Sequence, residues 1–247
     1  MDSEQYLNRF QAPSANKPSL QQLSELQRLH MTEVPFENLD VIRRVPIYLN
    51  LQSIYEKIVL RNRGGYCYEL NGLFHWLLKQ LGYDASLIAA TVFRPNGKWA
   101  KPDTHAAILV RLDEPYLVDV GFGDSTILPI PLSGSQQTDV SGTYAVQKSG
   151  KDVYDLIRSR NGESRPLYRF STIEQQLVDF HEGCVFNQVS PESTFTHFDI
   201  VTKAIPAGRM TVKDRELTVS ENGIISSKSL TESEKEAILL NSFGIKI

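Results

Sequence analysis

The sequence places a lone cysteine, Cys67, directly after two glycines and at the start of a predicted helix. From Leu70 onward the apolar residues recur every three or four positions, as on one buried helical face, and Gly82 supplies a stop. Unpaired amides and the positive end of the helix dipole would surround the sulfur and favour the nucleophilic thiolate. Most free cysteines are instead small buried hydrophobes, but this position favours a reactive thiol.

A histidine at the start of a predicted strand is the best-placed base for this thiol. The chain has five histidines, and His75 is excluded because eight residues of helix put it about 12 Å from the sulfur. His30 ends a predicted helix and His197 lies in a predicted strand, as ordinary surface or core residues do. His105 opens the apolar run 106–110, so its ring is expected at a sheet end facing a cleft.

Asp119 is the candidate partner of His105. A turn at 113–115 is followed by the apolar strand 116–121, which Asp119 interrupts. A carboxylate there costs several kcal/mol of desolvation unless it is paired or hydrogen-bonded. The hairpin brings it beside the strand of His105. Alone, Asp119 would be typical of a structural carboxylate, but together with Cys67 and His105 it predicts a Cys-His-Asp triad.

The second cysteine forms a local pair with a histidine, His181 and Cys184. Their spacing suits two metal ligands, but a second such pair is missing from the sequence. We therefore expect structural roles for both residues and no metal site.

The elements that must position the triad divide the chain into three predicted domains. Residues 1–82 read as helices and carry the nucleophile. Residues 83–172 change to period-two strands broken by Asn-Gly and Ser-Gly turns, and carry the histidine and the aspartate. Residues 173–247 are expected to form a smaller α/β domain.

The third predicted domain begins with a helix over residues 173–180. Strands follow near residues 195–202 and 210–220, and a last helix is opened by a capping box of Thr231 and Glu234.

Four blocks in order along nearly the whole chain resemble the arylamine N-acetyltransferase family. The resemblance implies an α+β fold with an N-terminal helical bundle, a central antiparallel β-barrel-like domain and a C-terminal α/β lid. It also implies a triad like that of transglutaminases and papain-like peptidases. The four blocks are Val34–Asp40, Arg63–Phe74, Tyr116–Gly123 and Ser190–Ser193.

The resemblance places the family's catalytic triad on Cys67, His105 and Asp119, the set that the chemistry of the residues favours. It also implies a hydrogen bond from Asn71 near Asp119. The candidate substrate-binding residues are Phe36, Val92, Thr104, Phe122 and Gly123. Each of the apolar members of this set could equally be plain core.

By this resemblance, the reaction is a two-step transfer of an acetyl group from acetyl-coenzyme A, the co-substrate. Cys67 takes the acetyl group as a thioester and passes it to an arylamine, hydrazine or hydroxylamine-type nitrogen. His105 moves the protons and Asp119 orients its ring. No metal or redox cofactor is expected.

Two departures from the family pattern limit what the resemblance assigns. Gln188 and Val189 stand before Ser190, where the family usually has hydroxyl-bearing residues, and the C-terminal part is shorter than in animal members. The resemblance therefore assigns no coenzyme A contacts to this chain.

The composition is that of an ordinary globular protein of one or two compact units. Its 247 residues are 41% hydrophobic and 22% charged, with a formal net charge of −3. The negative charge, without basic runs, argues against a nucleic-acid binder. No stretch is apolar enough for a secretory signal or a membrane span. Two dissimilar cysteines favour the reducing cytosol over a disulfide framework.

Two other functions use the same residues. One is a transglutaminase-like or peptidase-like hydrolase with the same triad, which the blocks outside the triad disfavour. The other is a catalytically silent binding module of the same fold, which would have no need to keep all three triad residues. Separately, Glu37 and Arg63 are expected to pair as a buried structural brace, since a lone buried charge is destabilising.

Overall fold

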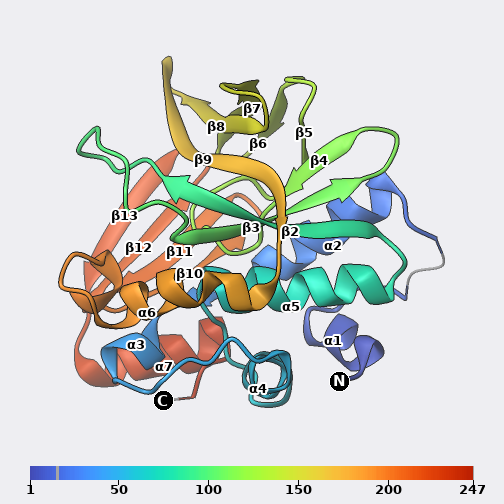
Figure 1. Cartoon of the computed structure of the whole chain (residues 1–247). Coiled ribbons are helices and arrows are strands. Elements are labelled where there is room, and N and C mark those ends of the chain that lie inside the picture. The colour runs from blue at the N-terminus through green and yellow to red at the C-terminus, as the bar shows by residue number, and fades with distance from the viewer. Residues whose placement is uncertain (15–16, 247) are drawn as a thin grey trace.

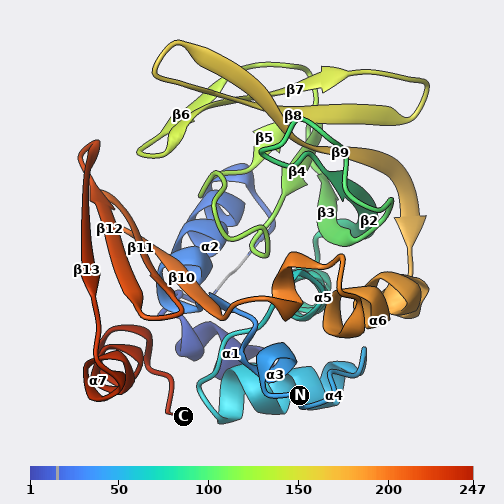
Figure 2. The same cartoon turned by 90° about the vertical axis from the view of Figure 1, so that its left-hand side faces the viewer.

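The computed structural model describes residues 1–14 and 17–246. Helices from the first part of the chain lie below a large sheet, and a second sheet stands beside both (Figures 1 and 2). The helical part contains α1 (Ser3–Arg9), α2 (Leu20–Glu33), α3 (Leu39–Ile42), α4 (Leu51–Tyr55), a π-helical turn η1 (Glu56–Leu60) and α5 (Cys67–Gln80).

Helix α5 is the central element because it packs against the large sheet on one side and the other helices on the other. Its apolar stripe, predicted from spacing, is buried along the length of the helix, including Leu70, Leu73 and Phe74. The helix ends just before Gly82, which has a left-handed φ of 84° that favours glycine. Sequence periodicity therefore placed both ends of this helix correctly.

The large sheet has eight antiparallel strands in the order β5-β4-β3-β2-β9-β8-β7-β6. It curls until β5 at one edge contacts β7 near the other, which gives the expected barrel-like form. Its strands are β2 (Asp84–Val92), β3 (His105–Arg111), β4 (Pro115–Val118), β5 (Ile130–Pro131), β6 (Gln137–Asp139), β7 (Gly142–Lys148), β8 (Val153–Arg160) and β9 (Glu163–Gln175).

The second sheet, here called the lid sheet, has five antiparallel strands in the order β1-β10-β11-β12-β13. Its first strand comes from the helical part, because Phe36 pairs with Thr202, which lies 166 positions further along the chain. The lid elements are β1 (Phe36–Glu37), η2 (Leu177–Phe180), α6 (His181–Val189), η3 (Thr194–Thr196), β10 (Ile200–Ile205), β11 (Gly208–Lys213), β12 (Glu216–Glu221), β13 (Ile224–Ser229) and α7 (Glu232–Phe243).

The helix expected over residues 173–180 is wrong in its first part, and only Leu177–Phe180 is helical, as the 3-10 turn η2. Strand β9 continues to Gln175, because Gln175 still pairs with Leu87 of β2, and the α-helix begins only at His181. Strand pairing with a distant segment overrides local helical spacing here. The expected domain boundaries at 82 and 172 stay a prediction, and β9 runs across the second of them.

Two strand predictions in the lid are also corrected. The segment expected as one strand over 210–220 is a hairpin of β11 and β12, because Asp214 adopts a positive φ of 50° and turns the chain. The strand expected over 195–202 begins only at Ile200, after a short helical turn. The capping box of Thr231 and Glu234 at the start of α7 is confirmed.

Candidate active site

Cys67 is the first residue of α5 and is 2% exposed. The preceding glycines let the chain approach its neighbours closely: a Cβ on Gly65 would lie 2.8 Å from that of Glu69, and one on Gly64 would overlap the carbonyl of Pro35. The side chain of Glu69 accepts a hydrogen bond of 3.1 Å from the amide of Tyr66. The position of the thiol is therefore fixed by the backbone that leads into the helix.

His105 and Asp119 form a buried pair. His105 is the first residue of β3, and Asp119 follows the last residue of the neighbouring strand β4. The Nε2 atom of His105 lies 2.8 Å from Oδ2 of Asp119, and both side chains are almost wholly buried. The contact expected from the hairpin is present.

The charge of this pair follows from its surroundings. Burial lowers the pKa of His105, but the charge and hydrogen bond of Asp119, together with the neighbouring Cys67, raise it to about 10. Burial raises the pKa of Asp119, but His105, Asn71 and the amide of Gly121 hold it below its ordinary value. At neutral pH the pair is therefore an imidazolium and a carboxylate.

Asn71 holds the aspartate from the helix that carries the cysteine. Its Nδ2 atom donates to Oδ1 of Asp119 at 2.9 Å and to the carbonyl of Ala106 at 2.7 Å. Its Oδ1 atom accepts the amide of Val120 at 3.0 Å, and the amide of Gly121 donates to Asp119 at 2.8 Å. The hydrogen bond that the family resemblance implied for Asn71 is confirmed.

Cys67 and His105 line the same pocket, here called the catalytic pocket, of about 210 Å³. Because Nε2 of His105 is taken by Asp119, the other ring nitrogen, Nδ1, is left to serve the sulfur. The carboxylate of Asp119, the imidazole of His105 and the thiol of Cys67 thus form a catalytic series. Such a series can activate the sulfur as a nucleophile and move its proton.

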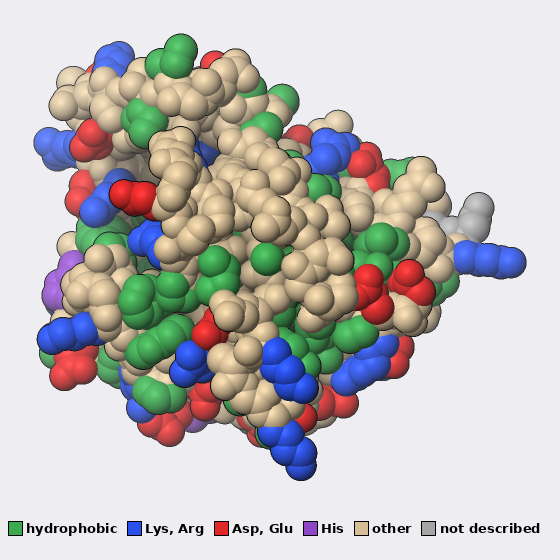
Figure 3. All heavy atoms as spheres, turned by 90° about the horizontal axis from the view of Figure 1, so that it is seen from above, with side chains coloured by type: hydrophobic (Ala, Val, Ile, Leu, Met, Phe, Trp, Pro, Cys, Tyr) green, Lys and Arg blue, Asp and Glu red, His purple; other side chains and the backbone are tan. Residues whose placement is uncertain are grey.

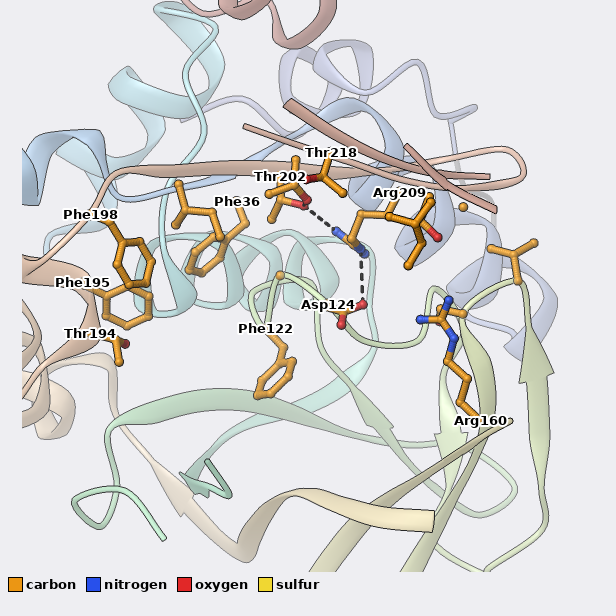
Figure 4. Close-up of a pocket in the computed structure, with 18 residues that line it drawn as sticks. Phe36, Phe122, Asp124, Arg160, Thr194, Phe195, Phe198, Thr202, Arg209 and Thr218 are labelled. Atoms are coloured by element: carbon orange, nitrogen blue, oxygen red, sulfur yellow. Dashed lines mark hydrogen bonds and ion pairs between the residues drawn. The ribbon is translucent and has the colours of Figure 1, made fainter. Parts of the chain in front are cut away.

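Four of the five predicted substrate-binding residues line the catalytic pocket: Phe36, Val92, Thr104 and Phe122. Gly123 lies instead on an adjoining cavity of about 410 Å³, here called the lid cleft. The two cavities adjoin each other, because some residues line both of them. Figure 4 shows the side chains of these shared residues. The shared residues are Phe36, Phe122, Thr194 and Phe195.

A family model described as N-acetyltransferase matches residues 19–247. An arylamine N-acetyltransferase from Escherichia coli is 33% identical over 98% of this chain and 88% of its own length. The chain belongs to the arylamine N-acetyltransferase family. This confirms the family, the α+β fold and the enzyme class expected from the four sequence blocks.

Solved structures of arylamine N-acetyltransferases superpose over essentially the whole chain. That from Mycobacterium marinum has a TM-score of 0.91 and 32% identity, covering 99% of this chain and 93% of its own. That from Bacillus cereus has a TM-score of 0.93 and 27% identity over both full chains, and its description reports a Cys-His-Glu triad. The present family member has an aspartate, Asp119, beside its histidine.

The buried brace between Glu37 and Arg63 is confirmed, with nitrogen to oxygen distances of 2.7 and 2.9 Å. The brace is larger than expected. Lys57, on the π-helical turn η1, lies 2.9 Å from Glu69 and 2.7 Å from Asp40. No local pattern in the sequence indicates this cluster, because its members are brought together only by the fold.

The other histidines and the second cysteine lie outside the catalytic pocket. His30 is fully buried, and burial lowers its pKa to about 3. His181 is exposed, whereas Cys184 is buried with its sulfur 2.7 Å from the hydroxyl of Tyr66. Among the described residues, no group of histidine, cysteine and acidic side chains could hold a metal ion.

Several pocket residues were missed by sequence reasoning. Phe195 and Asn187 come from the lid, and Phe186 precedes Asn187 on α6. Only Phe195 had a nearby signal, since it follows the Ser190–Ser193 block.

The charged side chains on the surface are mixed in sign, as the near-balanced composition predicts. Figure 3 shows acidic and basic side chains mixed over one face, without a large patch of one sign. In residues 1–14 and 17–246, no helix has the length and apolar character needed to cross a membrane.

Proposed function

We propose that this enzyme transfers an acetyl group from acetyl-coenzyme A to the nitrogen of an arylamine, hydrazine or hydroxylamine, through a thioester on Cys67. The observation that carries the proposal is the buried ion pair of His105 and Asp119 at 2.8 Å, beside a cysteine in the same pocket. Family membership supplies the reaction class.

In the first half-reaction, the thiolate of Cys67 attacks the carbonyl carbon of the acetyl thioester. The carbon–sulfur bond to coenzyme A breaks, and the departing sulfur takes its proton from the imidazolium of His105. One thioester replaces another, so the step is nearly isoenergetic and the acetyl group waits on the enzyme. Backbone amides at or beside Cys67, at the start of α5, would stabilise the oxyanion; losing one such donor typically costs about 3–4 kcal/mol.

In the second half-reaction, the amine attacks the same carbonyl carbon. His105 accepts the amine proton, the bond to sulfur breaks and the thiolate of Cys67 returns. Asp119 keeps the ring in the orientation and tautomer that both steps require. Asn71 keeps Asp119 in place and is therefore a positioning residue.

The catalytic pocket suits a flat aromatic amine. Phe36, Phe122 and Val92 provide an apolar wall beside Cys67, and Thr104 adds a polar group. Gly123 lines the adjoining lid cleft, which offers room for the longer donor. Donor and acceptor use the same sulfur in turn, which gives ping-pong kinetics.

The test is to mix the protein with acetyl-coenzyme A, without amine, and to measure the intact mass and the modified peptide. We expect one acetyl group on Cys67, none in Cys67→Ala and strongly reduced labelling in His105→Ala. Cys184→Ala is the matched control and should label like the unmodified chain. An unlabelled protein that releases no coenzyme A would contradict the proposal.

The same experiment separates the alternatives. A hydrolase of the transglutaminase-like class would release acid from an amide substrate, and a silent binding module would show neither reaction. The proposal includes a cytosolic location, because the nucleophile must remain a free thiol and both cysteines are free.

A further inference from the structure

The side chain of Glu69 folds back over the loop that leads into the nucleophile. Its Oε2 atom accepts the amide of Tyr66 at 3.1 Å, and a Cβ on Gly65 would lie 2.9 Å from this oxygen. Tyr66 is the N-cap of α5, but its own hydroxyl lies 2.7 Å from the sulfur of Cys184. The carboxylate of Glu69, and not the N-cap side chain, therefore satisfies a backbone donor at this helix start.

The peptide unit between Tyr66 and Cys67 is fixed by hydrogen bonds. The carbonyl of Tyr66 accepts the amides of Glu69 and Leu70, each at 3.0 Å, while the amide of Tyr66 donates to Glu69. The amide of Cys67 belongs to the same planar unit and has no hydrogen-bond partner among the described residues. A free amide beside the sulfur is the donor that an oxyanion on the acetyl carbonyl needs, and its direction follows from these bonds.

Lys57 is the counter-charge of Glu69. The Nζ atom of Lys57 lies 2.9 and 3.1 Å from the two carboxylate oxygens, and both side chains are almost wholly buried. Within the described part of the chain, no other cation lies within ion-pair distance of Glu69. Burial raises the pKa of Glu69, and Lys57 opposes part of that rise. A charged acceptor holds an amide about twice as strongly as a neutral one, so Lys57 strengthens the hydrogen bond to Tyr66.

Lys57 reaches this position from the π-helical turn η1. The amide of Arg61 donates to the carbonyl of Glu56 at 3.0 Å, five residues earlier, which is the wide hydrogen bond of such a turn. Glu56 and Leu60 of the turn are exposed, whereas Lys57 is 5% exposed. Turns of this kind are rare and occur frequently at functional sites. This one places a lysine in the core, where a charge is unfavourable unless it is paired.

The rest of the charged cluster balances without Glu69. Arg63 pairs with Glu37 at 2.7 Å and with Asp40 at 3.0 Å, and Lys57 contacts Asp40 at 2.7 Å. If Glu69 were removed, two carboxylates and two cations would remain. The buried brace therefore does not need this third carboxylate for its charge balance. What Glu69 adds is the contact with the backbone at the nucleophile.

We propose that Glu69 and Lys57 are a positioning pair that directs the backbone amide of Cys67 towards the oxyanion of the acetyl-transfer step. The inference rests on the proposed function, because this oxyanion forms only when the sulfur attacks a thioester carbonyl. In the described chain, neither residue of the pair lines the catalytic pocket. Both therefore act on the reaction through the backbone of Tyr66.

The test compares two reactions of the same sulfur. Acetylation by acetyl-coenzyme A passes through an oxyanion, whereas iodoacetamide loses iodide from a saturated carbon and forms none. Glu69→Ala removes the acceptor of the Tyr66 amide and leaves a cluster of balanced charge. We expect this variant to slow acetylation of Cys67 at saturating donor about tenfold, as a misdirected group does. The alkylation rate of Cys67 and the donor concentration that gives half the maximal acetylation rate should be unchanged.

Lys57 is tested by rescue. Lys57→Gln should also slow acetylation, because the carboxylate of Glu69 loses its counter-charge and holds the Tyr66 amide less strongly. Combining Lys57→Gln with Glu69→Gln should restore most of the rate. One amide side chain then accepts from Tyr66 with its oxygen and donates to the other with its nitrogen. Two independent structural losses would instead add, and a double variant slower than either single one would overturn the inference.

Leu239→Ala is the control for lost stability. Leu239 is fully buried in the core between α7 and the lid sheet, in a cluster separate from that of Cys67. Its truncation costs about 2–5 kcal/mol, which urea denaturation measures in all variants. Both reactions should keep their rates in this variant at a temperature where it is folded. A selective loss of acetylation here as well would overturn the inference, since lost stability would then explain it.

Two further results would overturn the inference while leaving the proposed acetyl transfer intact. One is an unchanged acetylation rate in Glu69→Ala, and the other is an equal loss of acetylation and alkylation. If iodoacetamide labels Cys67 in the unmodified chain but acetyl-coenzyme A does not, the proposed function itself fails and the inference fails with it.

Discussion

The amide of Asn71 lies 2.9 Å from the carboxylate of Asp119, so the helix that begins with the nucleophile also holds the acid of the triad. Asn71 is four residues after Cys67, one turn along α5. A displacement of this helix would therefore move the thiol and the aspartate together.

Asn71→Ala should reduce both stability and activity. It leaves the buried amide of Val120 and the carbonyl of Ala106 without their partner, and such groups cost about 1–3 kcal/mol each. Urea denaturation measures the stability and the rate of Cys67 acetylation measures the chemistry. A variant with full acetylation rate at lowered stability would remove Asn71 from the list of positioning residues.

The two fully buried histidines should differ in charge at neutral pH. His105, with a pKa raised to about 10, should be protonated at pH 8, whereas His30, with a pKa lowered to about 3, should be neutral. Nitrogen chemical shifts of ¹⁵N-labelled histidine report both states. Assignment follows from His105→Gln, and a neutral ring at position 105 at pH 8 would contradict the ion pair.

This pKa also predicts how stability changes with pH. Because the folded pKa of His105 exceeds its unfolded value, its contribution is complete below pH 6.5 and is lost as pH rises towards 10. Between pH 7 and pH 9 the unfolding free energy should therefore fall, at most by about 1.4 kcal/mol per pH unit. The slope should be smaller in His105→Gln. Parallel slopes for the two proteins would count against the raised pKa.

Lys57→Met should destabilise the fold by about 3–5 kcal/mol. It removes the cation that lies between Glu69 and Asp40. Arg63 still pairs with Asp40, but the buried carboxylate of Glu69 is left without a cation. The exposed Lys98→Met is the control. Thermal unfolding of both variants provides the measurement, and equal midpoints would show that the cluster contributes little.

Gly121→Ala should damage catalysis directly. An added Cβ would lie 2.8 Å from the backbone Cα of Cys67 and 2.7 Å from the side-chain Nδ2 of Asn71, which is held by its hydrogen bonds to Ala106 and Asp119. A misplacement of about 1 Å at a reacting group can cost about a hundredfold in rate. Gly150→Ala, whose Cβ would meet only the side chain of Val153, is the control for acetylation kinetics. Normal acetylation in Gly121→Ala would be the contrary result.

Local patterns in the sequence predicted the catalytic helix and the triad. The stripe from Leu70, the glycines before Cys67 and the apolar strand interrupted by Asp119 are each readable within about a dozen residues. What was missed depends on contacts between distant segments. Strand β9 extends to Gln175 because it pairs with β2, and Lys57 meets Asp40 only after folding.

The assignment of pocket residues divides in the same way. Phe36 and Phe122 lie in sequence blocks of the family and were predicted, whereas Phe186 belongs to α6, which was placed too early in the chain. No local pattern in the sequence predicted that Arg160 and Arg209 line the lid cleft. They lie on different sheets, and only the packing of the two sheets brings both to one cavity.

The walls around the sulfur come from the helical part, the large sheet and the lid, and include Phe36, Val92 and Phe186. An acyl-enzyme that waits for its acceptor is exposed to hydrolysis, and its lifetime depends on how well those walls keep water out. The lid therefore determines how fast water hydrolyses the acetyl-enzyme. A chain cut between β9 and α6 would convert the donor to free acetate instead of transferring the acetyl group, even with Cys67, His105 and Asp119 unaltered.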